Sequence, residues 1–166
     1  WLVDNGEQDE GQAYVFYGSA SGLDPTVSTL PAPYAADWIV EGNQAGFGLG
    51  RSVATAGDVN GDTYDDLIIG APHWDDLPSY SNGHVSVFYG SSTGLVDCGG
   101  GPCNPTHADW SIDGEQPLAE YGISVSTAGD VNGDTYDDVI VGAWLLDHPE
   151  ASEGQAFVYL GSATGL

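Results

Sequence analysis

The sequence predicts an all-β fold, made of repeated propeller-type blades of about four antiparallel strands each. Three observations support this. One pattern of aromatic and β-branched residues occurs three times, at 11–23, 83–95 and 154–166. Short apolar runs stop at Gly, as strands followed by tight turns do. No stretch shows the periodicity of an amphipathic helix.

Each period contains four strand candidates. SVATAGD and SVSTAGD alternate and then stop, DLIIGA and DVIVGA are apolar enough to be buried, and VSVFYG and AFVYLG have the aromatic and β-branched residues that strands prefer. ADWIVEG and ADWSIDG supply the fourth candidate. In chain order the candidates are 36–42, 52–58, 66–71 and 85–90, followed by 108–114, 124–130, 138–143 and 156–161.

The repeats divide the chain into a partial repeat at 1–23, a first full repeat at 24–95 and a second at 96–166. Trp1 aligns with Trp144, so the two ends match. Two periods do not close a propeller, which usually has about four to eight blades. Three alternatives stay open: the chain is a piece of a longer propeller, several copies close a ring, or copies stack into an open filament.

Charge excludes some classes of partner. The 166 residues include 25 acidic side chains and one basic side chain, Arg51, for a formal charge of -24. Nothing in the chain would neutralise phosphates, so nucleic acid is not expected as a partner. No run approaches the roughly 18 apolar residues of a membrane span, so no membrane insertion is expected. A neutral glycan, a basic protein or neighbouring copies of the chain fit this surface better.

The two cysteines predict an extracellular setting. Cys98 and Cys103 flank a Gly-rich loop, CGGGPC, and no second Cys pair or His pair is available for zinc. A local disulfide is the expected arrangement, and disulfides persist in oxidising compartments such as the cell exterior. The alternative is two reduced thiols.

The string DVNGDTYDD occurs twice, at 58–66 and 130–138. Its oxygen-bearing side chains stand at alternate positions, and crowded carboxylates repel each other unless a cation lies among them. Hard oxygen ligands without His or Cys favour calcium. The sequence therefore predicts two Ca²⁺ sites, each with one Tyr backbone carbonyl among its ligands. The ligands are Asp58, Asn60, Asp62, Tyr64 and Asp66, and Asp130, Asn132, Asp134, Tyr136 and Asp138.

Two details of these loops carry expectations of their own. Asp65 and Asp137 adjoin the last ligand and are expected to point away as solvated charges. The sixth position is Thr63 or Thr135, and a β-branched residue is strained there if the turn needs a positive φ. The alternative to calcium is an acidic turn that binds sodium or no ion.

The framing of these loops resembles the FG-GAP repeat of integrin alpha-chain propellers and their bacterial relatives. Phe47-Gly48 precedes the first loop and Gly70-Ala71-Pro72 follows it, while Tyr121-Gly122 and Gly142-Ala143-Trp144 frame the second. The resemblance implies adhesion or assembly rather than catalysis. It also implies that calcium stiffens the blades while loops on the opposite face bind protein or carbohydrate, and it leaves a filament or surface appendage open.

The competing functions have weaker support. The four His residues are scattered and no GxSxG element is present, so no enzyme is predicted. The alternative function is a carbohydrate-binding or polysaccharide-active propeller fragment. Trp38 and Trp110 hold equivalent places and so are expected in the core. Trp74 has no such equivalent and is the best candidate for a ligand contact.

Overall fold

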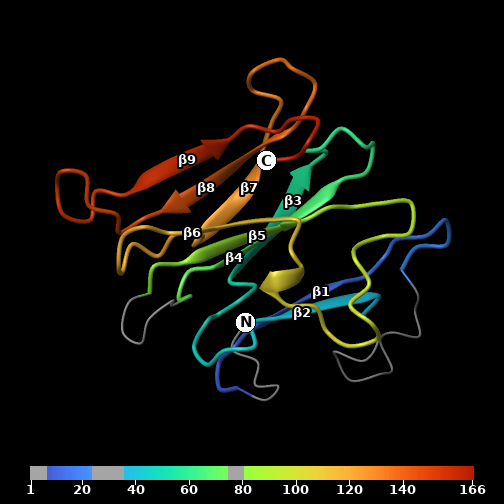
Figure 1. The fold of residues 1–166 in the computed structure, drawn as a ribbon, viewed down its shortest axis with the longest axis horizontal. Coiled ribbons are helices and arrows are strands. Elements are labelled where there is room, and N and C mark those ends of the chain that lie inside the picture. The colour runs from blue at the N-terminus through green and yellow to red at the C-terminus, as the bar shows by residue number, and fades with distance from the viewer. Residues whose placement is uncertain (1–6, 24–35, 75–80) are drawn as a thin grey trace.

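The computed structural model describes residues 7–23, 36–74 and 81–166, and this part of the chain is built from nine β-strands in three antiparallel sheets. Figure 1 shows the sheets layered in chain order, with β1 and β2 at one end of the stack and β7–β9 at the other. The all-β prediction is confirmed. No helix in the described ranges has the length and apolarity that a membrane crossing requires.

The first sheet pairs β1 (Gln12–Val15) with β2 (Trp38–Glu41). The second has the order β3 (Ser52–Gly57), β4 (Asp66–Ala71), β5 (His84–Phe88) and β6 (Trp110–Asp113). The third has the order β7 (Ser124–Gly129), β8 (Asp138–Ala143) and β9 (Gln155–Tyr159). A 3-10 turn, Pro105–His107, precedes β6.

The four-stranded sheet takes its outer strand from the following sequence repeat. β6 pairs with β5 in the register Val87↔Trp110 and Val85↔Ile112. In the same way β2, from the ADWIVEG segment, pairs with β1 of the segment before it. The first and second sheets therefore each join consecutive sequence repeats by main-chain hydrogen bonds.

The middle sheet is covered on both faces. One core cluster lies between it and the third sheet and includes Val59, Ile68, Val85, Val139 and Val141. A second lies between it and the first sheet and includes Trp38, Val40, Ile69 and Phe88. All five residues of β5 are buried. Double coverage explains why β4 is a nearly continuous apolar run instead of an alternating strand.

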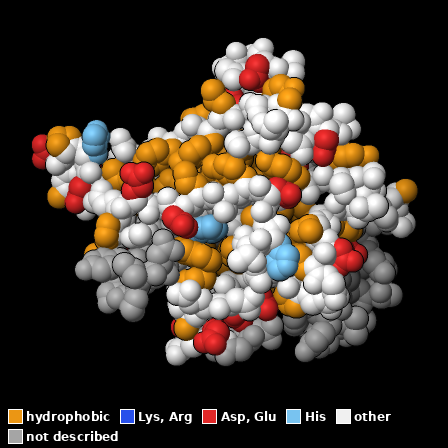
Figure 2. All heavy atoms as spheres, viewed as in Figure 1, with side chains coloured by type: hydrophobic (Ala, Val, Ile, Leu, Met, Phe, Trp, Pro, Cys, Tyr) orange, Lys and Arg blue, Asp and Glu red, His pale blue; other side chains and the backbone are white. Residues whose placement is uncertain are grey.

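The far face of the third sheet is not covered by any described residue in this way. Ile68 of β4 and Val59 of the preceding loop are fully buried, but their equivalents Ile140 and Val131 are 36% and 60% exposed. Val158 and Leu160 are exposed as well. Figure 2 shows hydrophobic side chains gathered where β8 and β9 cross the face in view, with scattered carboxylates around them.

Candidate functional site

The loop at 58–66 joins β3 to β4 and is folded around the Asp58 carboxylate. Asp58 Oδ1 accepts a hydrogen bond from the Asp62 N–H and Oδ2 accepts one from the Thr63 N–H, both at 2.9 Å. Asn60 Oδ1 accepts from the same Asp62 N–H, and Asp62 Oδ1 accepts from the Tyr64 N–H. The loop is thus a tight turn held by its own acidic side chains.

The loop at 130–138 has the same hydrogen bonds. Asp130 accepts from the backbone N–H groups of Gly133, Asp134 and Thr135. These bonds, chiefly the one from Thr135, lower the pKa of the Asp130 carboxyl. An ionised carboxylate therefore suits this turn even without a cation.

The last Asp of each loop anchors it to the sheet. Asp66 is 2% exposed; its Oδ2 accepts from the Val59 N–H at 3.0 Å and its Oδ1 accepts from the Gly90 N–H at 2.9 Å. Burial raises the pKa of Asp66 to about 6. Asp138 is fully buried and makes the equivalent bonds to Val131 and Gly161. A buried carboxylate without a basic neighbour is a natural place for an added cation.

The sixth loop position does adopt the conformation that the sequence marked as strained. Thr63 has φ = 77° and Thr135 has φ = 81°. This region is unfavourable for a β-branched residue. The N–H of each Thr donates to the first Asp of its loop, which holds the turn in place.

The donor set suits calcium chemically. Asp58, Asn60, Asp62 and Asp66 offer only oxygen acceptors, and each of their hydrogen-bonded oxygens retains a second lone pair. In the described ranges no three His, Cys, Asp or Glu side chains already converge on one point. The ligand sets at both loops therefore stay predictions, including the carbonyl ligands from Tyr64 and Tyr136.

The expectation that Asp137 is a solvated charge is wrong. Its Oδ2 accepts from the Asp58 N–H at 3.0 Å, and its own N–H donates to the Asp58 carbonyl at 3.1 Å. The Tyr136 ring lies so close to Gly61 that a Cβ there would be 2.5 Å from Cε1. The second loop thus clamps the first across the junction of two sheets. Asp65, by contrast, is exposed as expected.

Trp74, the predicted ligand contact, is half-buried in an aromatic stack. Its ring centroid lies 3.9 Å from that of Phe47 and 4.3 Å from that of His84. A sugar ring would have to displace one of these neighbours to stack on the indole. Trp38, predicted to be a core residue, is 6% exposed and packs edge-on against Phe88.

His84 forms a relay that the sequence did not reveal. Its Nδ1 lies 2.6 Å from Asp113 Oδ1 and its Nε2 lies 2.8 Å from Ser86 Oγ. The arrangement is that of a hydrolytic triad, but Ser86 is fully buried and no substrate carbonyl would reach its hydroxyl. In the first sheet Gln12 and Glu41 form a similar pair. The relay is a polar link between adjacent strands, and nothing in the described residues indicates catalysis.

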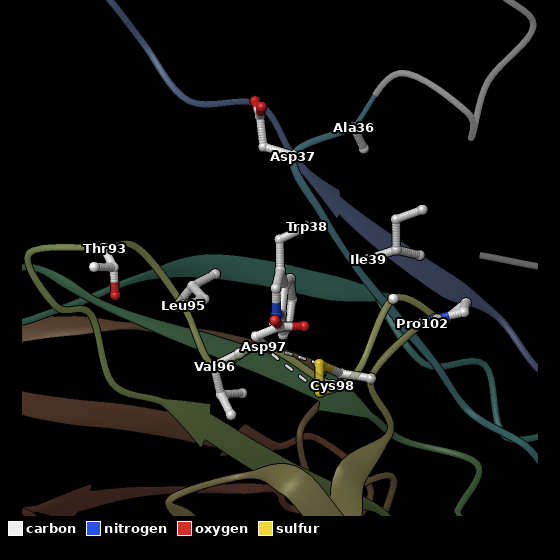
Figure 3. Close-up of a pocket in the computed structure, with 13 residues that line it drawn as sticks. Ala36, Asp37, Trp38, Ile39, Thr93, Leu95, Val96, Asp97, Cys98 and Pro102 are labelled. Carbon is white, nitrogen blue, oxygen red and sulfur yellow. Dashed lines mark hydrogen bonds between the residues drawn. A yellow bond between two sulfur atoms is a disulfide. The ribbon is translucent and has the colours of Figure 1, made fainter.

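The predicted disulfide is present and closes a loop beside β2. Cys98 and Cys103 are bonded, with their Cα atoms 5.3 Å apart. The Cys103 N–H donates to the Ile39 carbonyl, and the Cys103 carbonyl accepts from Glu41. The loop and β2 enclose a cavity of about 580 Å³. Figure 3 shows Trp38 pointing into it; the indole N–H is already bonded to the Val96 carbonyl at 3.0 Å.

Comparison with known protein families assigns the repeats. Residues 49–88 and 121–159 match the FG-GAP repeat model. The chain carries two FG-GAP repeats. Each match begins just before β3 or β7, the strand that leads into a DVNGDTYDD loop, and ends with β5 or β9.

The FG-GAP match corrects one detail of the motif. Its first range begins at Leu49, so the residue pair equivalent to Tyr121-Gly122 is Leu49-Gly50 and not Phe47-Gly48. The structure agrees, because Gly50 and Gly122 have φ of 79° and 82° and each donates its N–H to the Gly of the GAP segment, Gly70 or Gly142. The predicted pair was placed at Phe47 because it contains the Phe for which the motif is named, and it therefore lies two residues before the matched pair.

Integrin alpha chains are among the relatives of this FG-GAP chain. It is 38% identical to integrin alpha-PS2 of Drosophila melanogaster over 130 residues, which are 76% of this chain and 9% of the relative. It is 29% identical to integrin alpha-3 of Cricetulus griseus over 185 residues, 97% of this chain and 16% of the relative. Integrin alpha-V of Gallus gallus is 32% identical over 129 residues, 75% and 11% respectively. The chain spans about a tenth of the length of most of these relatives.

Proposed function

We propose that this FG-GAP chain is a non-catalytic adhesion or assembly module, stiffened by one calcium ion in each loop. The supporting observation is where the loops lie: residues 58–66 are hydrogen-bonded through Asp58 to Asp137 of the next loop. An ion in the first loop would therefore stiffen a turn that joins two sheets. The ions would be held by Asp58, Asn60, Asp62 and Asp66, and by Asp130, Asn132, Asp134 and Asp138, with Tyr64 and Tyr136 carbonyls.

An extracellular or cell-surface location is part of the same proposal. The disulfide Cys98–Cys103 favours an oxidising compartment. Extracellular calcium modules bind with Kd of about 0.1–1 mM, which matches loops that are partly open to solvent. The integrin names of the relatives are consistent with this setting.

We expect calcium to raise the thermal stability of the chain. At about 1 mM calcium, two sites with Kd of about 0.1–1 mM would together add about 1–3 kcal/mol to the free energy of unfolding. For a chain of this size that raises Tm by about 2–10 °C. Differential scanning calorimetry in calcium and in chelator measures the shift.

Matched variants separate ligand loss from charge loss. The double variant D62A/D134A removes one proposed ligand, together with its charge, from each loop and should abolish the calcium-dependent shift. The double variant E150Q/E153Q removes the same charge from exposed positions outside the loops and should keep the shift. Equal calcium shifts in the three proteins would rule out these loops as the binding sites.

The bare face of the third sheet is the proposed assembly surface. In the middle sheet the equivalent face is covered by the next sheet, which buries Ile68 completely, whereas Ile140 of the third sheet is 36% exposed. A further blade of the same kind, supplied by neighbouring repeats or by a second copy in a ring or filament, would bury it in the same way. Contiguous apolar surface of this type marks an interaction site.

Sedimentation velocity tests whether copies of the chain supply that blade. If they do, the chain should sediment as oligomers in millimolar calcium, and V158E, which lies on the bare face of β9 and outside the loops, should shift it towards the monomer. The exposed Ser92, in the loop that follows β5, gives the control S92E, which adds the same charge away from this face. A monomer at all concentrations would mean that copies of the chain do not cover the face.

A further inference from the structure

A cavity of about 430 Å³ lies between the second and third sheets. Its apolar wall is formed by Ile112, Tyr121, Leu146, Phe157 and Tyr159, and its acidic rim by Asp113, Glu115 and Asp147. Volumes of this size are typical of small-molecule sites that combine an apolar wall with a few polar groups. None of these residues belongs to the calcium loops.

The internal repeat explains why this cavity exists. At the junction between the first and second sheets, the equivalent place is filled by the stacked rings of Phe47, Trp74 and His84. The three residues that replace them at the second junction all line the cavity. They are Ala119, Leu146 and Gln155.

The equivalences follow from the backbone. The Gly83 N–H donates to the Trp74 carbonyl, and the Gly154 N–H donates to the Leu146 carbonyl. Likewise, His84 pairs with Ala71 as Gln155 pairs with Ala143. Phe47 accordingly corresponds to Ala119, since each N–H donates to the Gln three residues earlier.

Not all of the lost ring volume is open. Tyr121 and Phe157 replace the smaller Leu49 and Ser86, and their rings lie 5.6 Å apart in an edge-on arrangement. The Tyr121 hydroxyl donates to that of Tyr159 at 2.7 Å, which holds both rings in place. The cavity therefore has a fixed aromatic floor, and it opens above that floor where Trp74 would lie.

We propose that this cavity binds a small planar aromatic amine. An aromatic floor at the place where the chain elsewhere puts an indole favours a flat ring of similar size. Asp113 is already paired with His84, but Glu115 and Asp147 leave the rim, which also carries the His148 imidazole, with carboxylates that favour a positive charge on the ligand. An ammonium beside Tyr121, Phe157 and Tyr159 gains from the ring faces as well. The cavity lies at the end of β8 remote from the 130–138 loop, so calcium and amine would bind at opposite ends of that strand.

Tryptamine is the probe, and indole-3-propionate, which has the same ring and the opposite charge, is its control. Isothermal titration calorimetry should show saturable tryptamine binding that weakens as salt is added, and binding at least tenfold weaker for indole-3-propionate. No saturable binding of tryptamine up to about 5 mM, where even a millimolar Kd is measurable, would overturn the proposal. So would equal binding of the two probes.

Two variants locate the site. L146W puts an indole into the cavity, as Trp74 does at the first junction, and should weaken tryptamine binding at least tenfold without lowering Tm. E115Q leaves the wall intact and should weaken tryptamine several-fold while leaving indole-3-propionate unchanged or tighter. Unaltered tryptamine binding in both variants would place the ligand elsewhere. Since Glu115 is exposed, E115Q is expected to fold even if L146W does not.

Discussion

Gly70→Ala is expected to lower the free energy of unfolding by about 3 kcal/mol, whereas the equivalent Gly142→Ala lowers it by less than about 1 kcal/mol. Both residues lie in the fifth position of their strands, β4 and β8, and neither has a positive φ. A Cβ on Gly70 would overlap the carbonyl of Gly122, which lies just before β7 and, being backbone, does not move aside. A Cβ on Gly142 meets only the exposed Ser124 side chain, which is free to rotate.

Chemical denaturation of both variants in chelator measures the difference. Gly70 and Gly142 have the same strand position and a neighbouring Ser hydroxyl, and both are changed to alanine. The two variants therefore differ in the contact that Gly70 makes with Gly122. Gly57 and Gly129 offer a second matched pair, because a Cβ on Gly57 overlaps Asp137 whereas one on Gly129 meets no described atom within 4 Å. Equal losses at Gly70 and Gly142 would mean that the second and third sheets do not pack in solution as they do here.

The strands were predictable because repetition and burial act together. A strand covered on both faces, such as β4, reads as an apolar run, and two copies of that run fix the period of the fold. The exact repetition of DVNGDTYDD located both loops as well. The same repetition held information that the ligand prediction did not use. Tyr136 and Asp137 occupy repeated positions although neither side chain is needed as a ligand, and both side chains contact the neighbouring loop.

Contacts between repeats were beyond prediction for a physical reason. Periodicity reports which face of a strand is buried, but not which repeat buries it. β6 completes the sheet formed by β3, β4 and β5, and it pairs with β5 across a long connection. The periodicity of one strand does not predict such a pairing. Trp74 was predicted as a ligand contact because no second tryptophan repeats it. The structure places Leu146 at the equivalent position, and the difference between the two residues is a difference in how one junction is filled. A residue that breaks a repeat marks a change in packing as readily as a binding site.

Asp66→Ala is expected to lower the free energy of unfolding by about 2–4 kcal/mol even in chelator. Its carboxylate accepts from the N–H groups of Val59 and Gly90, and the alanine would leave both amides without this acceptor in a place from which water is largely excluded. Each buried donor left unsatisfied costs about 1–3 kcal/mol. Loss of the buried charge offsets part of this cost, since burial disfavours an ionised Asp66.

A comparison with Asp62→Ala separates what the loop contributes to stability through its own hydrogen bonds from what it contributes by binding calcium. Asp62 is exposed, and its carboxylate accepts only from Tyr64 and Asn60 within the loop. In chelator its loss should cost less than about 1 kcal/mol, while in calcium it should remove the stabilisation that the first site supplies. Urea unfolding with and without calcium gives the four values needed. If Asp66→Ala cost no more than Asp62→Ala in chelator, the buried aspartate would matter only as a calcium ligand, and the loop would owe its shape to the ion. The hydrogen bonds to Val59 and Gly90 predict the opposite, that the loop is shaped by its own backbone before any ion binds.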